Sequence, residues 1–183
     1  MRVISGSLKG RRLVSPTGQA TRPTADRIKE SVFNILASSI VNRRALDLFA
    51  GTGALGIEAL SRGAASAVFI DQAKPALDAL RRNIGNLGLE DRSRIIRWDI
   101  RKNLNCLASS PPFDLVFMDP PYATGAVTPA LKSLIACGAL ETSARIVIEH
   151  SDREIIAPRM DPLTLIDQRR FGKTLVSFLD AVV

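Results

Sequence analysis

The amino-acid sequence predicts an α/β fold, in which a mostly parallel sheet carries helices on both faces and ends in a C-terminal antiparallel hairpin. Three observations predict it. Short apolar runs typical of buried strands alternate with segments whose apolar residues recur at helical spacing. A glycine-rich loop follows the first of these strand-like runs. Near the C-terminus the alternation stops, and two strand-like runs flank Arg169-Arg170-Phe171-Gly172, which is typical of a hairpin.

The expected elements follow in chain order. A first helix is expected after Pro23, with Thr24 as its N-cap, because an apolar stripe follows at Ile28, Val32, Ile35, Leu36 and Ile40. A second helix follows the glycine loop and stops near Gly63, and a third has Pro75 near its start and Gly88 after its end. A fourth is expected at 127–136, and seven strands are expected at 45–49, 66–71, 94–98, 113–118, 145–149, 163–166 and 174–179.

The net charge of +7 is carried by the first quarter of the chain. Nine basic and two acidic residues occur up to Arg44, whereas the remaining sequence carries 16 of each sign. Such a basic segment favours a polyanionic partner, most often nucleic acid, and a solvated basic segment without a partner is the alternative. We expect residues 1–183 to form one domain, with residues 1–44 as a basic extension that includes the first helix.

The composition also narrows the class of protein. Cys106 and Cys137 are the only cysteines and His150 is the only histidine, so no familiar zinc-site spacing occurs and no disulfide framework is expected. No apolar run approaches the roughly 18 residues of a membrane span. The N-terminal residues Met1-Arg2-Val3-Ile4-Ser5-Gly6 lack the apolar core of a signal peptide. We therefore expect a cytoplasmic protein without a metal ion or membrane contact.

The segment 47–56, which holds the glycine loop, indicates a nucleotide-type cofactor. Glycines between a strand and a helix let the backbone approach a ligand closely. Asp71 ends the next strand 20 residues after Gly51, where an acid can bind a ribose. Nicotinamide dinucleotides and S-adenosylmethionine (SAM) both suit this pattern. A carboxylate at Asp47 favours SAM, because SAM has an ammonium group, and Asp99 follows the third strand in position for an adenine amino group.

The tetrapeptide Asp119-Pro120-Pro121-Tyr122 follows the apolar run 113–118, so a carboxylate emerges where a buried strand ends. The two prolines remove N–H donors and leave carbonyl acceptors, and the tyrosine offers a stacking face. These groups together match a flat heterocycle with an exocyclic NH2 group. An ordinary strand-to-loop turn is the alternative. Because Asp47, Asp71, Asp99 and Asp119 each end a successive strand, we expect them along one edge of the sheet.

These features resemble the class I SAM-dependent methyltransferases that act on exocyclic amines. The resemblance is closer to the RsmD family, the 16S rRNA guanine-N2 methyltransferases. It covers residues 1 to about 150, with a weaker similarity at Gly172-Lys173-Thr174. The segments that carry it are Met1–Gly6, Gly10-Arg11, Arg22-Pro23-Thr24, Asp26-Arg27, Phe33-Asn34, Asp47–Leu60, Ser61-Arg62-Gly63, Asp119–Tyr122 and Glu149.

The resemblance implies a Rossmann-like class I methyltransferase fold with a seven-stranded sheet, and methyl transfer from SAM with S-adenosylhomocysteine as product. It makes Asp119, Pro120, Pro121 and Tyr122 the catalytic motif. It assigns to cofactor binding Asp47, Phe49, Ala50, Gly51, Thr52, Gly53, Asp71, Gln72, Asp99, Ile100, Arg22 and Thr24. Many members carry a further acid near Ala73, so ribose recognition would fall to Asp71, with Gln72 nearby.

The expected partner is 16S rRNA, either free or within an assembling small ribosomal subunit, and the protein is expected to be a monomer. The candidate RNA contacts are Lys9, Arg11, Arg12, Arg22 and Arg27. An adenine-N6 methyltransferase is the alternative, since its motif also resembles the tetrapeptide. With all segments assigned, none remains for a separate DNA-reading domain, which favours folded RNA. A non-catalytic nucleotide- or RNA-binding domain would leave the tetrapeptide unexplained, and Asp47 disfavours a dehydrogenase.

Overall fold

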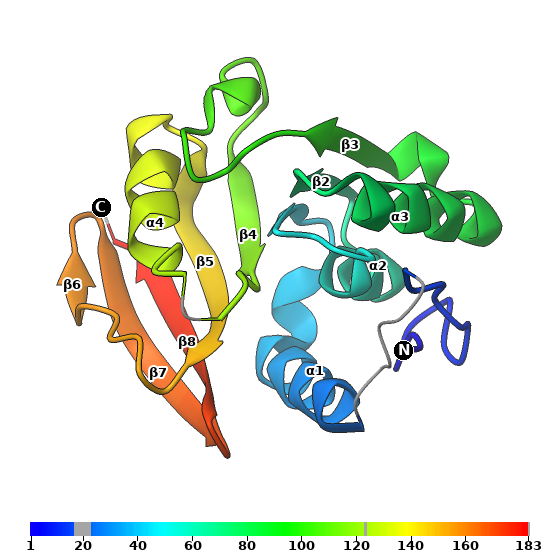
Figure 1. Ribbon diagram of the computed structural model, residues 1–183, viewed down its shortest axis with the longest axis horizontal. Coiled ribbons are helices and arrows are strands. Elements are labelled where there is room, and N and C mark those ends of the chain that lie inside the picture. Colours follow the sequence, from blue (N-terminus) through cyan, green and yellow to red (C-terminus); the bar gives the residue numbers. More distant parts are fainter. Residues whose placement is uncertain (17–22, 123, 183) are drawn as a thin grey trace.

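One eight-stranded sheet forms the centre of the molecule, in the order β3-β2-β1-β4-β5-β8-β7-β6 (Figure 1). The computed structural model describes residues 1–16, 23–122 and 124–182. The parallel strands are β1 (Arg44–Leu48), β2 (Ser66–Asp71), β3 (Ser93–Arg97), β4 (Phe113–Met118) and β5 (Leu140–Ser151). The antiparallel strands are β6 (Arg159–Met160), β7 (Leu163–Phe171) and β8 (Thr174–Ala181). The α/β fold with a Rossmann-like parallel sheet and a C-terminal antiparallel hairpin is therefore confirmed.

Helices cover the two faces of the sheet unequally. The helices α1 (Pro23–Leu36), α2 (Ala54–Ser61) and α3 (Lys74–Leu87) pack on one face, and α4 (Val127–Ala136) packs on the other (Figure 1). Short 3-10 helices lie between these elements: η1 (Ala37–Ile40), η2 (Glu90–Arg92) and η3 (Asn105–Leu107). Two hydrophobic cores result, one on each side of the sheet.

Alternating residues of the strands supply the two cores. In β4, Leu115 and Phe117 belong to the core beneath α1, α2 and α3, whereas Val116 and Met118 belong to the core beneath α4. The ring centroid of Phe117 lies 5.4 Å from that of Phe33 in α1, which fixes this helix on the sheet. Strands buried on both sides explain why their sequences are continuous apolar runs.

Three expectations about the elements were wrong in detail. The sheet has eight strands instead of seven, because the two-residue strand Arg159–Met160 is too short to show an alternating pattern. The strand β5 starts at Leu140, before the apolar run that begins at Ala144, and its pairing with β4 is irregular at this end. Thr24 does not precede the first helix: α1 begins at Pro23, whose fixed φ suits a first helical position.

The first 13 residues of the basic N-terminal segment form a hairpin. A β-bridge joins Arg2 to Arg12, and the backbone N–H of Gly10 donates to the carbonyl of Val3 at 2.9 Å. At Gly6 the backbone has a φ of +82°, and a Cβ there would collide with the Ser61 carbonyl of α2. Only glycine therefore allows the hairpin to approach α2 this closely.

A buried carboxylate in α2 holds this hairpin. Glu58 has no exposed surface, and it accepts hydrogen bonds from the backbone N–H groups of Ile4 at 2.8 Å and Ser5 at 3.0 Å. It also pairs with Lys29 of α1 at 3.3 Å and with Arg62 at 2.8 Å. Lys29 donates in turn to the Arg2 carbonyl at 2.6 Å, so its charge lies inside the molecule and does not add to the basic surface.

The strand order places a crevice at the carboxyl ends of the parallel strands. The chain runs outward from β1 to β2 and β3 on one side, and from β4 to β5 on the other, so the direction of winding reverses between β1 and β4. Ligands of open α/β sheets bind at such a reversal. None of the helices in the described part of the chain has the length and apolar character needed to cross a bilayer.

Candidate active site

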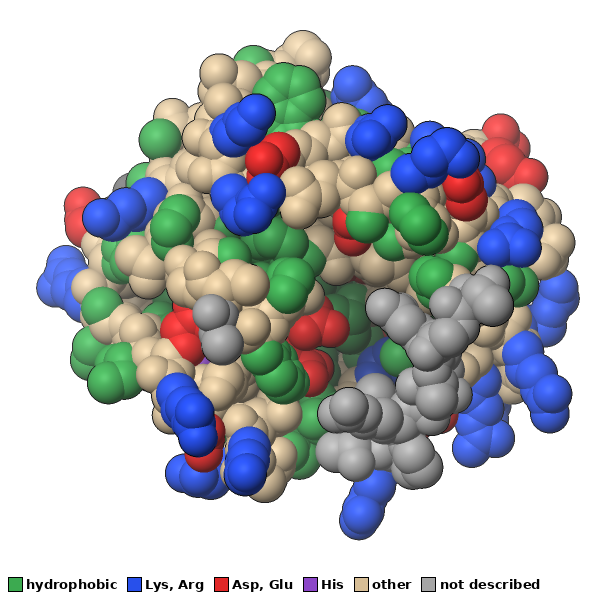
Figure 2. Space-filling model, in the orientation of Figure 1, with side chains coloured by type: hydrophobic (Ala, Val, Ile, Leu, Met, Phe, Trp, Pro, Cys, Tyr) green, Lys and Arg blue, Asp and Glu red, His purple; other side chains and the backbone are tan. Residues whose placement is uncertain are grey.

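A hollow of about 680 Å³ lies at the carboxyl ends of the parallel strands. This size is typical of small-molecule sites. Loops after β1, β2, β3 and β4 and the end of β5 line it, and the residues are Pro16, Phe49, Gly51, Thr52, Asp71, Gln72, Ala73, Pro75, Ala76, Trp98, Asp99, Ile100, Asp119, Pro120, Pro121, Tyr122 and Glu149. Figure 2 shows acidic side chains around a hollow in the middle of this face and basic side chains near its margin.

The glycine loop is held tightly against the sheet. Phe49 has a positive φ of 60°, which is unfavourable for a non-glycine residue and is typical of backbone held at a binding site. A Cβ on Gly51 would have the Phe49 carbonyl oxygen, at 4.0 Å, as its nearest neighbour, so the loop is open there. In contrast, a Cβ on Gly53 would collide with Leu80. Gly51 thus exposes backbone to the hollow, whereas Gly53 serves close packing of the loop against α3.

Asp47 lies beneath this loop and does not line the hollow. Its side chain is 2% exposed, and its Oδ2 accepts a hydrogen bond from the Gly56 backbone N–H at 2.9 Å. Burial raises the pKa of Asp47 to about 8, and the nearby Asp71 charge acts in the same direction. The predicted contact of Asp47 with a cofactor ammonium group remains a prediction. Ala50 and Gly53 are likewise buried behind the lining residues.

The acids after β2 and β3 both line the hollow, but they are held differently. Asp71 accepts backbone N–H groups on both oxygens, from Gly51 at 2.9 Å and from Ala73 at 2.8 Å, and so ties the glycine loop to the end of β2. Asp99 pairs with Arg101 at 3.1 Å, and hydrogen bonds from that guanidinium lower the pKa of Asp99. The side chains of Trp98 and Ile100, on either side of Asp99 in the sequence, add apolar surface to the lining.

Asp119 and Glu149 are neighbouring carboxylates in the hollow. Met118 of β4 pairs with Ile148 of β5 in the parallel register. Asp119 directly follows Met118 and Glu149 directly follows Ile148, so the two acids lie side by side on adjacent strands. Asp119 opens into the hollow and stays solvent-accessible. Desolvation of the carboxyl group by the surrounding protein raises the pKa of Asp119, and the negative charges of Glu149 and Asp47 raise this pKa further. Burial likewise raises the pKa of Glu149.

Tyr122 is tied to the sheet by its hydroxyl group. The hydroxyl donates to Glu149 Oε1 at 3.0 Å and lies 2.9 Å from the Thr174 hydroxyl of β8. Since a phenol has one proton, donation to Glu149 leaves the Tyr122 oxygen as acceptor for the Thr174 hydroxyl. Burial and the Glu149 charge raise the pKa of Tyr122 to about 12, so the phenol keeps its proton. The side chain remains 48% exposed, which leaves a ring face for stacking.

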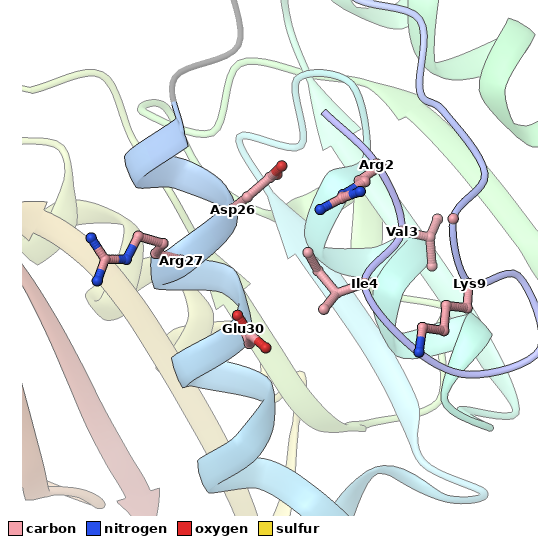
Figure 3. Close-up of a pocket in the computed structure, with 8 residues that line it drawn as sticks. Arg2, Val3, Ile4, Lys9, Asp26, Arg27 and Glu30 are labelled. Carbon is pink, nitrogen blue, oxygen red and sulfur yellow. The ribbon is translucent and has the colours of Figure 1, made fainter.

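The candidate RNA contacts lie on the N-terminal hairpin and α1. Lys9 and Arg27 line a second pocket of about 500 Å³ between these two elements, together with Arg2, Val3, Ile4, Gly10, Asp26 and Glu30 (Figure 3). Figure 3 shows that Arg27 points away from the hairpin, on the other side of α1. Arg11 donates to the Asn86 carbonyl at 2.7 Å, and Arg12 is exposed. Arg22 and the side chain of Thr24 lie outside the described residues.

Similarity to known proteins agrees with this architecture. A family model described as "Conserved hypothetical protein 95" matches residues 1–180. The chain is 39% identical to YlbH of Bacillus subtilis (strain 168), over 97% of each chain. It is 37% identical to Ribosomal RNA small subunit methyltransferase D of Escherichia coli (strain K12), over 81% of this chain and 74% of the relative. The chain belongs to the RsmD methyltransferase family.

A solved structure also matches the fold of this chain over its whole length. That of yhhF from Escherichia coli superposes with a TM-score of 0.87 at 32% identity, and covers 100% of this chain and 98% of that chain. No group of three or more histidine, cysteine or carboxylate side chains suited to a metal ion occurs among the described residues.

Sequence reasoning missed several residues of the hollow. Glu149 appeared only as part of the family pattern, and Trp98 only as the last residue of the expected strand 94–98. Thr174, which bonds Tyr122 from outside the lining, appeared only in the weaker similarity at 172–174. Their position on adjacent strand ends is a matter of sheet order, which a single sequence does not show. A third pocket, lined by residues of α1 and β7, brings Arg27 near Arg169 and Phe171. Arg27 of the basic N-terminal segment and Arg169 of β7 therefore line one pocket, together with Glu30.

Proposed function

We propose that this protein transfers a methyl group from SAM to the exocyclic N2 amine of a guanine in 16S rRNA of the small ribosomal subunit. One observation carries the proposal: the tetrapeptide 119–122 opens into the same hollow as the acids Asp71 and Asp99 and the glycine loop. A base acceptor and a cofactor site thus share one cavity. The name of the Escherichia coli relative, Ribosomal RNA small subunit methyltransferase D, supports rRNA of the small subunit as substrate. The same proposal puts the protein in the cytoplasm, where ribosomal subunits assemble.

The residues of the hollow fit SAM. Asp71 and Asp99 offer carboxylate oxygens from two neighbouring strand ends, where ribose hydroxyls and an adenine amine need acceptors. Ile100 and Trp98 offer apolar surface for the adenine ring, and Gly51 leaves its backbone open to the ligand. When bound, SAM supplies an activated methyl group. Asp47 would support the glycine loop from beneath, through the hydrogen bond that its carboxylate accepts from the Gly56 N–H group.

The chemistry at the base follows from the tetrapeptide. The N2 nitrogen of guanine is a weak nucleophile, because its lone pair is delocalised into the ring. Hydrogen bonds from its two protons to the Asp119 carboxylate and the Pro120 carbonyl would orient it and favour pyramidal geometry. Tyr122 would stack on the flipped base. The N2 nitrogen would gain the methyl group as the bond between that group and the sulfur breaks, leaving S-adenosylhomocysteine, and Asp119 would accept the proton that the nitrogen loses. Most of the acceleration would come from positioning and electrostatic stabilisation.

The direct test measures methyl transfer and its product. Purified protein is incubated with tritium-labelled SAM and either free 16S rRNA or small subunits that lack the modification, followed by nucleoside analysis. N2-methylguanosine is the expected product. N6-methyladenosine would replace the proposal by the adenine alternative, and no incorporation into any RNA would refute methyl transfer to RNA.

A single substitution separates catalysis from cofactor binding. Asp119→Ala should abolish methyl transfer while SAM binding, measured by calorimetry, survives. The matched control is Asp91→Ala, which removes an exposed carboxylate remote from the hollow. Equal loss of SAM binding and transfer in Asp119→Ala would indicate a structural role for this carboxylate.

Salt dependence tests the basic surface. Replacing Lys9, Arg11 and Arg12 by glutamine should weaken RNA binding and flatten the slope of log K against log[salt] by about 0.7–0.9 for each phosphate that the protein no longer neutralises. The control removes three exposed charges from α3: Lys74, Arg81 and Arg82. An unchanged slope in the first variant would exclude these three residues as phosphate contacts.

A further inference from the structure

Glu149, one of the four carboxylates that line the hollow, has no role in the chemistry described so far. Glu149 stands beside Asp119 on the adjacent strand, lines the same hollow, and binds Tyr122 through Oε1 alone. No hydrogen bond from the described residues reaches its other oxygen, Oε2. A carboxylate with a free oxygen next to the proposed acceptor of the N2 protons needs a further donor when a base fills the site, because burying an unpaired acceptor is costly.

Guanine and adenine differ in the group that lies next to the reactive amine. In guanine the ring nitrogen N1 beside N2 carries a proton and donates a hydrogen bond. In adenine both ring nitrogens beside N6, which are N1 and N7, carry lone pairs and accept hydrogen bonds. An ionised carboxylate beside the amine acceptor therefore attracts one base and repels the other.

We propose that Glu149 selects guanine by accepting the N1–H proton, while Asp119 and the Pro120 carbonyl accept the two N2 protons. Glu149 is then a specificity-determining residue of the proposed reaction, on which this inference rests. The three donors of the guanine edge would meet three acceptors, two from the loop after β4 and one from β5.

The surrounding hydrogen bonds fix Glu149 as an acceptor. Tyr122 donates its single proton to Oε1, and the Thr174 hydroxyl can donate to the Tyr122 oxygen. These hydrogen bonds favour the ionised form of Glu149 and occupy Oε1, so that Oε2 has no hydrogen bond from the described residues. Burial raises the pKa of Glu149, and the hydrogen bond from Tyr122 acts against that effect. An incoming N1–H donor acts in the same direction as Tyr122.

The test replaces the methylated guanine by 2-aminopurine in a small-subunit RNA. This base keeps the N2 amine but lacks the N1 proton and O6. Wild-type protein should methylate it about 10- to 100-fold more slowly than guanine, as expected for the loss of a hydrogen bond to a charged group. The Glu149→Gln variant should methylate guanine more slowly than the wild type does. Its methylation rate on 2-aminopurine should fall much less relative to the wild type, because its amide can donate a hydrogen bond to the unprotonated N1. Loss of O6 is common to both proteins and cancels in the comparison.

The control variant is Thr174→Val, which removes the outer hydroxyl of the chain and leaves Glu149 in place. It should slow both substrates by the same factor. Equal slowing of both substrates by Glu149→Gln would overturn the inference and leave Glu149 as a support for Tyr122. A wild-type rate on 2-aminopurine within about threefold of guanine would overturn it without any variant. Failure of the wild type to methylate any guanine would refute the proposed function itself.

Discussion

Asp47→Asn should change how the stability of the protein depends on pH. The folded-state pKa of Asp47 is about 8, whereas an unfolded aspartate titrates near ~3.9. A raised folded pKa gives a contribution that is fully present below the unfolded pKa and is lost as pH rises through the folded pKa. The slope is about 1.4 kcal/mol per pH unit well below pH 8, which integrates to roughly 2 kcal/mol between pH 6 and pH 8.

Asparagine is isosteric and keeps an acceptor for the Gly56 N–H group, so the variant should fold without this pH dependence. Urea unfolding at pH 6, 7 and 8, followed by the fluorescence of Trp98, gives the free energy of unfolding for both proteins. From pH 6 to pH 8, the free energy of unfolding of the wild type should fall by roughly 2 kcal/mol relative to that of the variant. Asp91→Asn, at an exposed carboxyl, should show no such shift. A constant difference for Asp47→Asn would show that the buried carboxyl is ionised throughout, and would refute the reasoning.

Three further predictions concern other buried or crowded groups. Glu58→Gln should lower the free energy of unfolding by about 3–5 kcal/mol, because it leaves the buried lysine ammonium without its counter-charge; thermal unfolding measures this, and a loss below about 1 kcal/mol would contradict it. Gly56→Ala should lower the free energy of unfolding by about 1–3 kcal/mol, because its Cβ would collide with the Phe69 ring. Gly85→Ala in the helix α3 should raise the free energy of unfolding by about 0.5–1 kcal/mol, because the nearest atom to its Cβ lies at 3.6 Å. The raised pKa of Asp119 should make kcat/KM fall on acidification at a higher pH than an ordinary carboxylate would, and a flat profile down to about pH 5 would contradict the assigned proton acceptor.

The fold and the outline of the site could be predicted because their signals are local. Ser66–Asp71, Phe113–Met118 and Val127–Ala136 occur as expected, since buried parallel strands and an amphipathic helix leave continuous or periodic apolar patterns. The acids Asp71, Asp99 and Asp119 meet at one hollow, because the carboxyl ends of parallel strands share one edge.

The remaining features depend on contacts between distant segments. The sequence pattern groups Asp47 with the other strand-end acids, yet it lies within β1, paired with Phe69 and Phe117, and its side chain is buried under α2. Lys29 is one of the basic residues of the N-terminal segment, but its ammonium group is buried in an ion pair with Glu58. The partners of Tyr122 come from β5 and β8, and only the sheet order brings them together.

The position of Thr174 on β8 has a consequence for the order in which the protein becomes competent during its own synthesis. The glycine loop and the acids after β2 and β3 are all present once residue 100 has left the ribosome. The hydroxyl that completes the hydrogen-bond chain to Tyr122 emerges more than 70 residues later, on a strand that inserts between β5 and β7. The residues of the proposed cofactor-binding half are therefore synthesised before the residue that holds the base-binding half in place. Competence for the proposed reaction should come only when the hairpin of β7 and β8 closes the sheet.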